Sequence, residues 1–413
     1  MPTLDPVTPL THLGAFKGYG IELEYMIVDR DSLAAEPLAD RLLVDAAGQV
    51  VNEIEHGELA WSNELVAHVV ELKTNGPADS LGGLAEHFHA DVRAINQALS
   101  GHGACLLPTA MHPLFDPLLE TVLWPYGQNE IYAAYDRIFG CNGHGWSNLQ
   151  SMHINLPFAN DEEFRHLHAA IRVVLPLIPA LSASSPLEQG KASAWLDNRL
   201  RYYRDNQRRV PSISGQVIPE PVSSIEDYHR QILAPMYEAI APHDPDNILA
   251  DDWLNSRAAI ARFERQTIEI RIIDLQECPA ADLAIAELVV ALVRAFYDEE
   301  LADIATQQAM DTSTLADCLF LAAERGSKAV IEHAGYLELL GIDKPMTAGQ
   351  IWQLLLERLP DVSAGSRALL LKLIKRGTLA EAIMAHLGDR PNPDAIKHCY
   401  RKLAQCLQDN QLF

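Results

Sequence analysis

The sequence predicts an α+β fold, in which a small number of strands precede a long run of helices. Strand patterns with alternating polar and apolar residues end before residue 276, and the chain from residue 280 onward has helical spacing almost throughout. Strands and helices do not alternate one for one, so a doubly wound parallel sheet is disfavoured. The strand patterns carry their charged residues on one face, which would form a polar floor if the strands were stacked in one antiparallel sheet.

The first half of the chain contains loops, one strand and two helices. Residues 1–16 have the composition of a loose leader, and the alternating residues 18–28 predict a strand. Apolar residues at helical spacing predict a helix over residues 81–101. Residues 102–148 are rich in Pro, Gly and aromatic residues, which indicates irregular loops with one helix near residues 129–139.

Two further strands and a series of helices follow. The strands are predicted at residues 149–157 and 266–275, separated by a helix over residues 161–175 and a polar stretch over residues 182–224. Later helices, several of them behind Pro, Ser, Asn or Asp start signals, are predicted at residues 281–302, 328–340, 348–359, 363–375 and 392–407.

The net charge and composition exclude several classes of protein. The chain has 413 residues, with 32 Lys and Arg against 56 Asp and Glu, which gives a formal charge of −24. No run of basic residues occurs, so we expect neither nucleic acid nor an anionic membrane surface as a partner. No apolar stretch reaches the ~20 residues of a membrane span, and the N-terminus lacks signal-peptide features. Six cysteines without a CxxC spacing favour the reducing cytoplasm.

The strand over residues 18–28 places two carboxylates on one face. Glu22 and Glu24 share this face, while Ile21 and Leu23 point to the other. Same-face neighbours lie roughly 7 Å apart, and two carboxylates at that distance repel by ~2 kcal/mol at an effective dielectric constant of about 20. A bound cation would relieve this repulsion in a half-buried strand. The alternative is an edge strand with a solvated polar face.

A second pair of carboxylates, Glu64 and Glu71, flanks an apolar run. A helix would align the two on one face, whereas a single strand would place them on opposite faces, and the pattern leaves both conformations open. An unpaired charge inside an apolar run is costly. Glu71 is therefore either a metal ligand or the ion-pair partner of a group on a neighbouring strand.

The two later strands carry further polar groups on one face. In residues 149–157, His153 is either a structural histidine or a nitrogen ligand in a set otherwise made of oxygens. In residues 266–275, Glu269 and Arg271 share the polar face. They form either an intra-strand salt bridge or a metal ligand beside a guanidinium that faces a phosphoryl group.

Together these groups indicate metal-dependent phosphoryl transfer. Stacked in one antiparallel sheet, five carboxylates and one imidazole would form a floor that suits Mg²⁺ or Mn²⁺ better than Zn²⁺. An adjacent Arg suits a phosphate. The chain lacks the P-loop, the Rossmann glycine motif, HExxH and Gly-x-Ser-x-Gly, so the chemistry would proceed without a P-loop.

The same residues resemble the glutamate–cysteine ligase type 2 family, within the carboxylate–amine ligases that share the glutamine-synthetase catalytic fold. The resemblance covers residues 18–300 and implies a catalytic domain there, with a curved antiparallel sheet around ATP and two or three Mg²⁺ ions. A helical extension over residues 301–413 would act as a support, a lid or a homodimer surface. The matching segments are Gly20-Ile21-Glu22-Leu23-Glu24, Glu64 with Glu71-Leu72-Lys73-Thr74, Met152-His153-Ile154-Asn155, and Glu269-Ile270-Arg271 with Asp274.

The resemblance also implies roles for individual residues. Arg271 would contact the phosphates of ATP. The segment that starts at Ser185-Pro186 resembles the family's Ser-Pro…Arg stretch, which implies that Arg199 lies near a substrate carboxylate or phosphate, with Arg201 and Tyr203 as competitors for this role. The implied metal ligands are Glu22, Glu24, Glu64, Glu71, His153 and Glu269.

The implied activity is amide-bond formation through an acyl phosphate. The γ-carboxylate of L-glutamate would attack the γ-phosphate of ATP, and an amine, cysteine in glutathione biosynthesis, would displace phosphate.

Two other classes of protein remain open. A metal-dependent amide hydrolase would use the same carboxylates to activate water, and would leave Glu269 and Arg271 without a purpose as a pair. A non-catalytic regulator that binds metal or nucleotide would not need the complete ligand set. Cys278 is expected to be a buried small residue and not a nucleophile.

Overall fold

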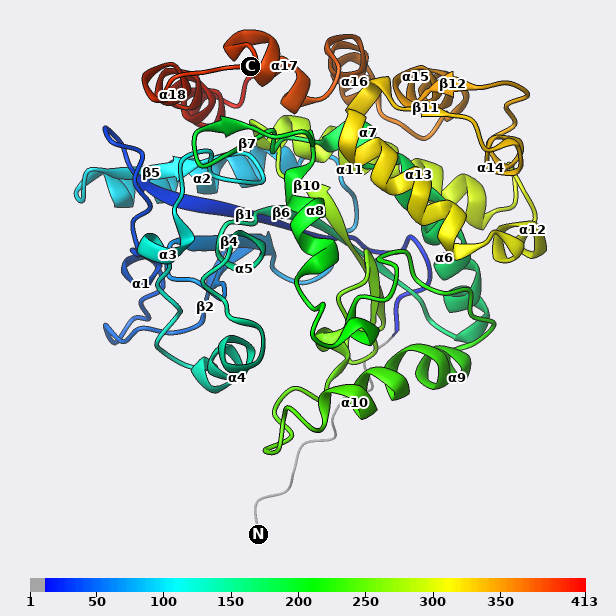
Figure 1. The fold of residues 1–413 in the computed structure, drawn as a ribbon, viewed down its shortest axis with the longest axis horizontal. Coiled ribbons are helices and arrows are strands. Elements are labelled where there is room, and N and C mark those ends of the chain that lie inside the picture. Colours follow the sequence, from blue (N-terminus) through cyan, green and yellow to red (C-terminus); the bar gives the residue numbers. More distant parts are fainter. Residues whose placement is uncertain (1–11) are drawn as a thin grey trace.

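A computed structural model describes residues 12–413 and shows an eight-stranded sheet at the centre of the molecule (Figure 1). Neighbouring strands in this sheet pair antiparallel, so the predicted α+β class is confirmed. The strand order is β2 (Glu53–His56), β3 (Leu59–Asn63), β4 (Val69–Thr74), β1 (Gly20–Asp29), β6 (Ser151–Pro157), β10 (Thr267–Asp274) and β9 (Ala259–Arg262), and β5 (Ala104–Leu107) pairs with the end of β1.

Strand periodicity gives the sheet one apolar and one polar face. On β1, Ile21, Leu23 and Tyr25 are fully buried, and burial of a side chain of this size contributes about 1.5–3 kcal/mol. The residues between them, Glu22 and Glu24, point to the opposite face, as the alternation predicts. The apolar face therefore anchors the strand, and the polar face remains available for chemistry.

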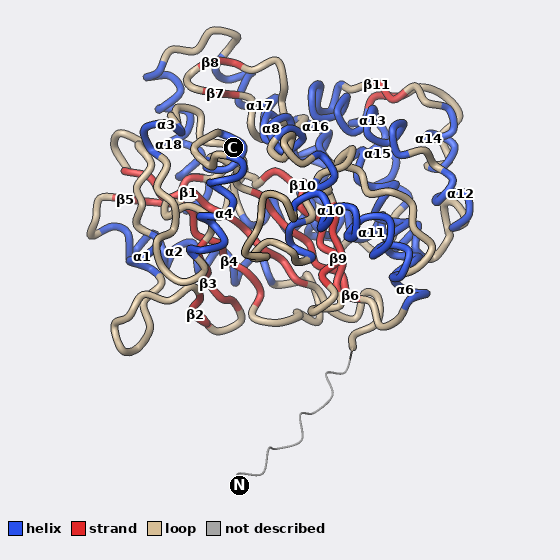
Figure 2. The backbone as a smooth tube through the Cα atoms, turned by 60° about the horizontal axis from the view of Figure 1, so that its bottom comes forward, coloured by secondary structure: helices blue, strands red, loops and turns tan. Residues whose placement is uncertain are grey.

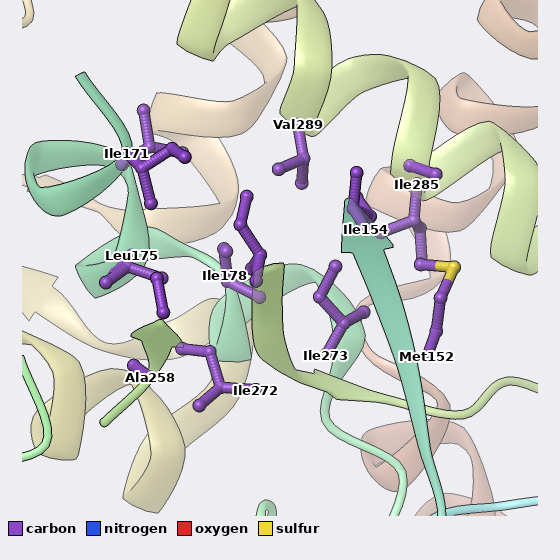
Figure 3. Packing of buried hydrophobic residues seen from close by; sticks show 14 of the residues in the cluster. Met152, Ile154, Ile171, Leu175, Ile178, Ala258, Ile272, Ile273, Ile285 and Val289 are labelled. Carbon is purple, nitrogen blue, oxygen red and sulfur yellow. The ribbon is translucent and has the colours of Figure 1, made fainter. Parts of the chain in front are cut away.

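Three long helices pack against the apolar side of the sheet. Figure 3 shows Met152 and Ile154 of β6 beside Ile285 and Val289 of the central helix. That helix begins at Pro279. Proline has no backbone N–H, but the N–H groups of the first turn have no acceptor within the helix, so no hydrogen bond is lost. The three helices are α2 (Leu84–Ser100), α6 (Asp161–Val174) and α11 (Pro279–Tyr297).

Shorter elements connect these layers (Figure 2). Two small two-stranded sheets pair β7 (Leu187–Glu188) with β8 (Lys191–Ala192) and β11 (Val330–Ile331) with β12 (Met346–Thr347). The short helices are α1 (Ala39–Leu42), α3 (Pro117–Glu120), α4 (Asn129–Phe139), α5 (His144–Ser147), α7 (Pro179–Ser182), α8 (Asn198–Asp205), α9 (Ile225–Tyr228) and α10 (Ala234–Ile240).

The last third of the described chain is a set of capped helices. Thr347 and Thr378 each form a capping box, and Asp311 and Asn392 accept a backbone N–H in the first turn of the helices that they precede. These helices are α12 (Ile304–Ala309), α13 (Thr312–Arg325), α14 (Ala334–Leu339), α15 (Ala348–Arg358), α16 (Ala364–Arg376), α17 (Leu379–Leu387) and α18 (Pro393–Asp409).

Three predictions about local structure are wrong. The predicted helix over residues 328–340 begins only at Ala334, because the short strand β11 precedes it. Helices α13 and α17 were not predicted. Residues 12–16 are not loose, since the Ala15 N–H donates to the Glu163 carboxylate at 2.9 Å and Phe16 packs edge-on against Tyr297. The rest of the predicted leader, residues 1–11, lies outside the described residues.

One apolar core runs from the sheet into the C-terminal helices. It includes Ile270 of β10, Val289 of α11, Leu319 of α13 and Trp352 of α15. The division into residues 18–300 and 301–413 stays a prediction, as does the role of the C-terminal helices as a support, a lid or a homodimer surface. No helix within residues 12–413 is both long and apolar enough to cross a bilayer.

Candidate active site

The polar face of the sheet gathers the predicted acidic residues at one place. Glu22 of β1 lies opposite His153 of β6, and Glu24 of β1 lies opposite Glu71 of β4. Residues directly opposite in an antiparallel pair point to the same side of the sheet. Glu269 joins them from β10, the strand next to β6. The register of the ladder thus forms the carboxylate floor, which we define as these residues together with Glu64.

Glu22 has three polar partners within the described chain. Its Oε2 lies 2.6 Å from His153 Nδ1, its Oε1 accepts from the Asn155 amide at 3.0 Å, and the Arg265 guanidinium lies 3.8 Å away. Burial opposes ionisation, but the hydrogen bond and positive charge of His153 lower the pKa of Glu22 to about 2. In turn, the carboxylates around His153 overcome the effect of burial and raise its pKa to about 9. In the metal-free protein the imidazolium therefore neutralises part of the floor.

Glu24 is oriented by the neighbouring strand β6. Its Oε2 accepts from the Ser151 backbone N–H at 2.6 Å and from the Ser151 hydroxyl at 2.9 Å. The same hydroxyl lies 2.9 Å from His153 Nε2. Ser151 thus links Glu24 to the imidazole, and both acids of β1 are held in place by side chains of β6.

Glu64 and Glu71 are brought together by a hairpin, which differs from both conformations that the sequence left open. Glu64 begins the loop between β3 and β4, and Glu71 lies on β4, where its Oε1 accepts from the Ser62 hydroxyl at 2.8 Å and lies 3.5 Å from Lys73 Nζ. Burial and the charge of Glu22 raise the pKa of Glu71 to about 7, against the effect of Lys73. Burial and the charge of Glu24 raise the pKa of Glu64 well above its usual range.

Glu269 is held between two guanidinium groups. Its Oε1 lies 2.9 Å from Arg271 Nε, and its Oε2 accepts from Arg262 at 3.0 Å. The predicted pairing of Glu269 with Arg271 is therefore present, whereas Arg262 was not predicted. The two guanidinium groups orient the Glu269 side chain, and its Oε1 lies 3.8 Å from His153 Nδ1.

A β-bulge places Arg271 beside the floor. Ile270 pairs with Ile154 and Ile273 pairs with Met152, so two residues of β10 stand against one of β6. The Arg271 carbonyl accepts from the Arg199 guanidinium at 2.7 Å. The regular alternation predicted for this strand fails at the bulge, because Ile272 and Ile273 are both fully buried (Figure 3).

The floor offers two groups of ligand atoms that fit a divalent cation. Within each group the ligand atoms lie within 4.8 Å of one another. Carboxylate oxygens with one imidazole match the preferences of Mg²⁺ and Mn²⁺. The raised pKa values of Glu64 and Glu71 indicate negative charge that the surrounding protein groups do not compensate. The groups share His153 and consist of Glu22, His153 and Glu269, and of Glu24, Glu71 and His153.

Two cavities flank the carboxylate floor. The first, which we call the aromatic cavity, has a volume of about 440 Å³ and contains Glu24, Glu64 and Arg271 in its wall. The second, the β1–β4 cavity, has a volume of about 430 Å³ and is lined by Glu22 and Lys73. The remaining walls of the aromatic cavity carry the side chains of Tyr132, Tyr135, Trp146, Tyr203 and Trp253. The floor can therefore be reached by one reactant from each cavity.

Comparison with known proteins assigns the family. The sequence profile of glutamate-cysteine ligase family 2 matches residues 19–337, which include every residue of the floor. The chain belongs to glutamate-cysteine ligase family 2. Membership makes it an enzyme of the carboxylate–amine ligase type, as the resemblance implied.

Individual relatives of this family-2 ligase support the assignment. A protein of Archaeoglobus fulgidus of uncharacterised function is 33% identical over 397 residues, which cover 95% of this chain and 99% of that protein. A protein of Streptomyces coelicolor, provisionally named glutamate–cysteine ligase 2, is 27% identical over 68% of each chain. The fold also matches a crystal structure of glutamate–cysteine ligase from Francisella tularensis in complex with AMP. That match has a TM-score of 0.60 at 12% identity and covers 94% of this chain and 88% of that one.

The structure distinguishes among the three candidate residues that lie in the Ser-Pro…Arg segment of this family-2 ligase. Arg199 is buried, contacts the backbone of Arg271 and lies 3.6 Å from Asp274. Both Arg199 and Tyr203 line the aromatic cavity. Arg201 does not reach the cavity, because it pairs with Glu188 at 2.5 Å outside it. Arg199 therefore joins the floor to the fully buried Asp274.

Several polar residues beside the floor were not predicted as site residues. Ser62, Lys73, Ser151 and Asn155 each contact one of the predicted acids. Lys73 and Asn155 lie within the family segments, but strand alternation alone does not distinguish a residue that faces a ligand from one that faces a solvated surface. Cys278 is fully buried and its burial raises its thiol pKa, as expected for a residue that is not a nucleophile.

Proposed function

We propose that this chain is an ATP- and Mg²⁺-dependent ligase that forms an amide bond through an acyl-phosphate intermediate. The acid is a glutamate-like amino acid, activated at its γ-carboxylate, and the acceptor is cysteine or another small amine. The observation that carries this proposal is the carboxylate floor, in which two ligand groups share His153 between two cavities. Such a floor suits two reactants that must meet at a metal-bound phosphoryl group.

The metal ions would be held by the two ligand groups that share His153, with Glu64 beside the second group. When bound, Mg²⁺ neutralises the charge of the triphosphate and orients its γ-phosphoryl group for in-line attack. Arg271 lies at the edge of the same floor and stabilises charge on the transferring phosphoryl oxygens. Glu269 fixes the direction of Arg271 through their 2.9 Å contact.

The reaction then has two balanced steps on the substrates. A carboxylate oxygen of the acid attacks the γ-phosphorus, the bond to the β-phosphate oxygen breaks, and ADP leaves. The amine nitrogen next attacks the acyl carbon, loses a proton, and phosphate leaves as the amide forms. The aromatic cavity excludes water from the activated acid, since bulky aromatic side chains form much of its wall.

The two competing classes make different use of the same floor. An amide hydrolase needs a metal-bound water but no triphosphate, so Arg262, Arg265 and Arg271 would have no phosphate to contact and would serve only as partners of the floor acids. A non-catalytic regulator would bind a nucleotide without turnover. The cations beside the floor therefore favour the ligase.

The test is release of ADP by the purified full chain with Mg²⁺-ATP, L-glutamate and a panel of amines that includes cysteine. We expect ADP release to require both the acid and Mg²⁺ and to rise when an accepted amine is added. Glu24→Gln should abolish it, and Glu55→Gln, which alters an exposed acid of β2, should not. ADP release that no acid and no amine stimulates would remove the ligase proposal.

A further inference from the structure

A third large cavity lies at the end of β1, away from the carboxylate floor. Its volume is about 930 Å³, which is within the range of small-molecule sites. It lies between the end of β1, β5, α2 and α18, and Figure 1 shows these elements together at the upper left. Arg30, which lines this cavity, directly follows β1 and comes six residues after Glu24. At the rise of a strand, the backbones of these two residues are about 20 Å apart. The cavity is therefore separate from the active site.

Three arginines and one acid line this cavity, which we call the arginine cavity. The arginines are Arg30 after β1, Arg93 of α2 and Arg401 of α18, and Asp31 is the only carboxylate among the lining residues. Within residues 12–413, no carboxylate oxygen lies within 4.0 Å of any of the three guanidinium groups. Arg30 donates to the backbone oxygen of Ala104 and lies beside the Cys105 thiol, and Arg401 donates to the backbone oxygen of Asp31.

This arrangement is unusual for a chain with a net charge of −24. The three arginines are exposed, so water and salt screen the repulsion between their guanidinium groups, and no carboxylate of the described chain pairs with them. Two of the wall amides, Asn96 and Gln408, hydrogen-bond to each other at 2.8 Å. Guanidinium groups match oxyanions in bidentate geometry, and a cavity wall of one charge attracts the opposite charge.

We infer that the arginine cavity binds a small multivalent oxyanion that joins α18 to α2. Arg93 and Arg401 come from these two helices, so one ligand with several anionic oxygens contacts both. Oligophosphates and polycarboxylates share this chemistry. Binding neutralises the cluster and stabilises the contact between the C-terminal helix and the sheet domain.

The test is calorimetric titration of the full chain with sodium tripolyphosphate and, separately, with citrate, in EDTA and low salt. We expect saturable binding of at least one of them, weakened tenfold or more by Arg93→Glu and by added salt. Arg93 has no hydrogen-bond partner in the described chain, so the variant should fold normally. Lys402→Glu changes the exposed residue next to Arg401, outside the cavity lining, and should reduce affinity far less than Arg93→Glu.

Two outcomes would overturn this inference. One is the absence of binding heat and of any thermal shift with both anions. The other is equal affinity of the parent and Arg93→Glu, which would place the anion elsewhere, for example beside the arginines of the active site. Arg93→Gln provides a second variant if charge reversal impairs folding. Catalytic activity is not a readout, so this test is independent of the proposed ligase function.

Discussion

His153 is the residue shared by the two groups of candidate metal ligands in the active site. Its imidazole contacts Glu22 and Ser151 and belongs to both groups of candidate metal ligands. A histidine with a pKa of about 9 carries a proton at neutral pH. The proton thus occupies, in the metal-free protein, a position where a divalent cation would bind. The floor is consequently a set of acids whose mutual repulsion is only partly relieved before a metal binds.

Neutralising one floor acid should therefore stabilise the metal-free fold while it removes activity. Burial and Glu22 raise the pKa of Glu71 to about 7, so at pH 8 its charge opposes folding. We expect Glu71→Gln to raise the free energy of unfolding in EDTA by about 2 kcal/mol and to eliminate Mg²⁺-dependent ADP release. Denaturant unfolding in EDTA measures the first effect, and the ADP-release assay in Mg²⁺ measures the second. A less stable variant in EDTA, or one with full activity, contradicts this interpretation.

The second residue-scale prediction concerns the geometry of Arg271. Its Nε lies 2.9 Å from the Glu269 carboxylate in an ion pair, and another nitrogen donates to the Asn255 carbonyl at 3.3 Å. Lysine keeps the charge but cannot make both contacts. We expect Arg271→Lys to lower kcat/KM about 100-fold, or about 2.7 kcal/mol in activation free energy.

The matched control for Arg271→Lys is Arg137→Lys on the exposed end of α4, where activity should be unchanged. Steady-state ADP release under saturating Mg²⁺ gives both values. Parental kcat/KM in Arg271→Lys would show that charge alone suffices at this position.

At the scale of elements, the sequence predicted β1, β6 and β10 but neither the other five strands of the sheet nor the way in which the strands join. Alternation placed Glu22 and Glu24 on one face of β1, and the structure shows this arrangement. The same alternation could not decide the conformation around Glu64. The hairpin there depends on pairing between β3 and β4, and neither strand can be identified from its own sequence alone. The bulge at Arg271 was also missed, since two consecutive buried isoleucines are compatible with a regular strand in a buried sheet.

Close packing between β1 and β6 gives an element-scale prediction. A Cβ at Gly20 would lie 2.9 Å from Asn155 Cβ on the neighbouring strand. Gly20→Ala should therefore separate β1 from β6 near Glu22, lower stability by about 1–3 kcal/mol and reduce activity. The control is Gly101→Ala at the end of α2, where nothing lies within 4 Å and φ is −66°. Thermal unfolding of both variants measures the difference, and equal melting temperatures would contradict the packing argument.

At the scale of the whole molecule, the net charge of −24 conceals local sites of opposite charge. Five of the 56 acids, Glu22, Glu24, Glu64, Glu71 and Glu269, lie at the floor, which we propose binds Mg²⁺. The arginine cavity shows the opposite local charge on the same chain. The sequence alone could show the sum of the charges and the floor residues. It could not show the arginine cavity, because its three arginines come from segments that are far apart in the chain.

Acid stability of the molecule is predicted to depend on a buried neutral histidine. Burial among aromatic side chains, with a contribution from Arg172, lowers the pKa of His168 to about 3. Below the unfolded pKa of about 6.5, the unfolded chain binds a proton that the folded chain excludes, so folding is destabilised as pH falls. Relative to the parent, the free energy of unfolding of His168→Leu should rise by about 1.4 kcal/mol between pH 7.5 and pH 5.5.

Denaturant unfolding of the parent and the variant at pH 7.5, 6.5 and 5.5 measures this gain. His102→Leu, at an exposed position, is the control and should show no pH-dependent difference from the parent. A stability difference between parent and His168→Leu that does not change with pH would show that His168 is not held neutral in the fold.

Transfer of oxygen from the acid to phosphate tests the central claim most directly. The purified chain is supplied with Mg²⁺-ATP, an accepted amine and L-glutamate whose γ-carboxylate carries ¹⁸O, and the released phosphate is analysed by ³¹P NMR. An acyl phosphate passes one carboxylate oxygen to each phosphate, so we predict one ¹⁸O per phosphate, in step with amide formation. Phosphate that carries no ¹⁸O while ATP is consumed would show that water, and not the acid, accepts the phosphoryl group, and would contradict the ligase mechanism.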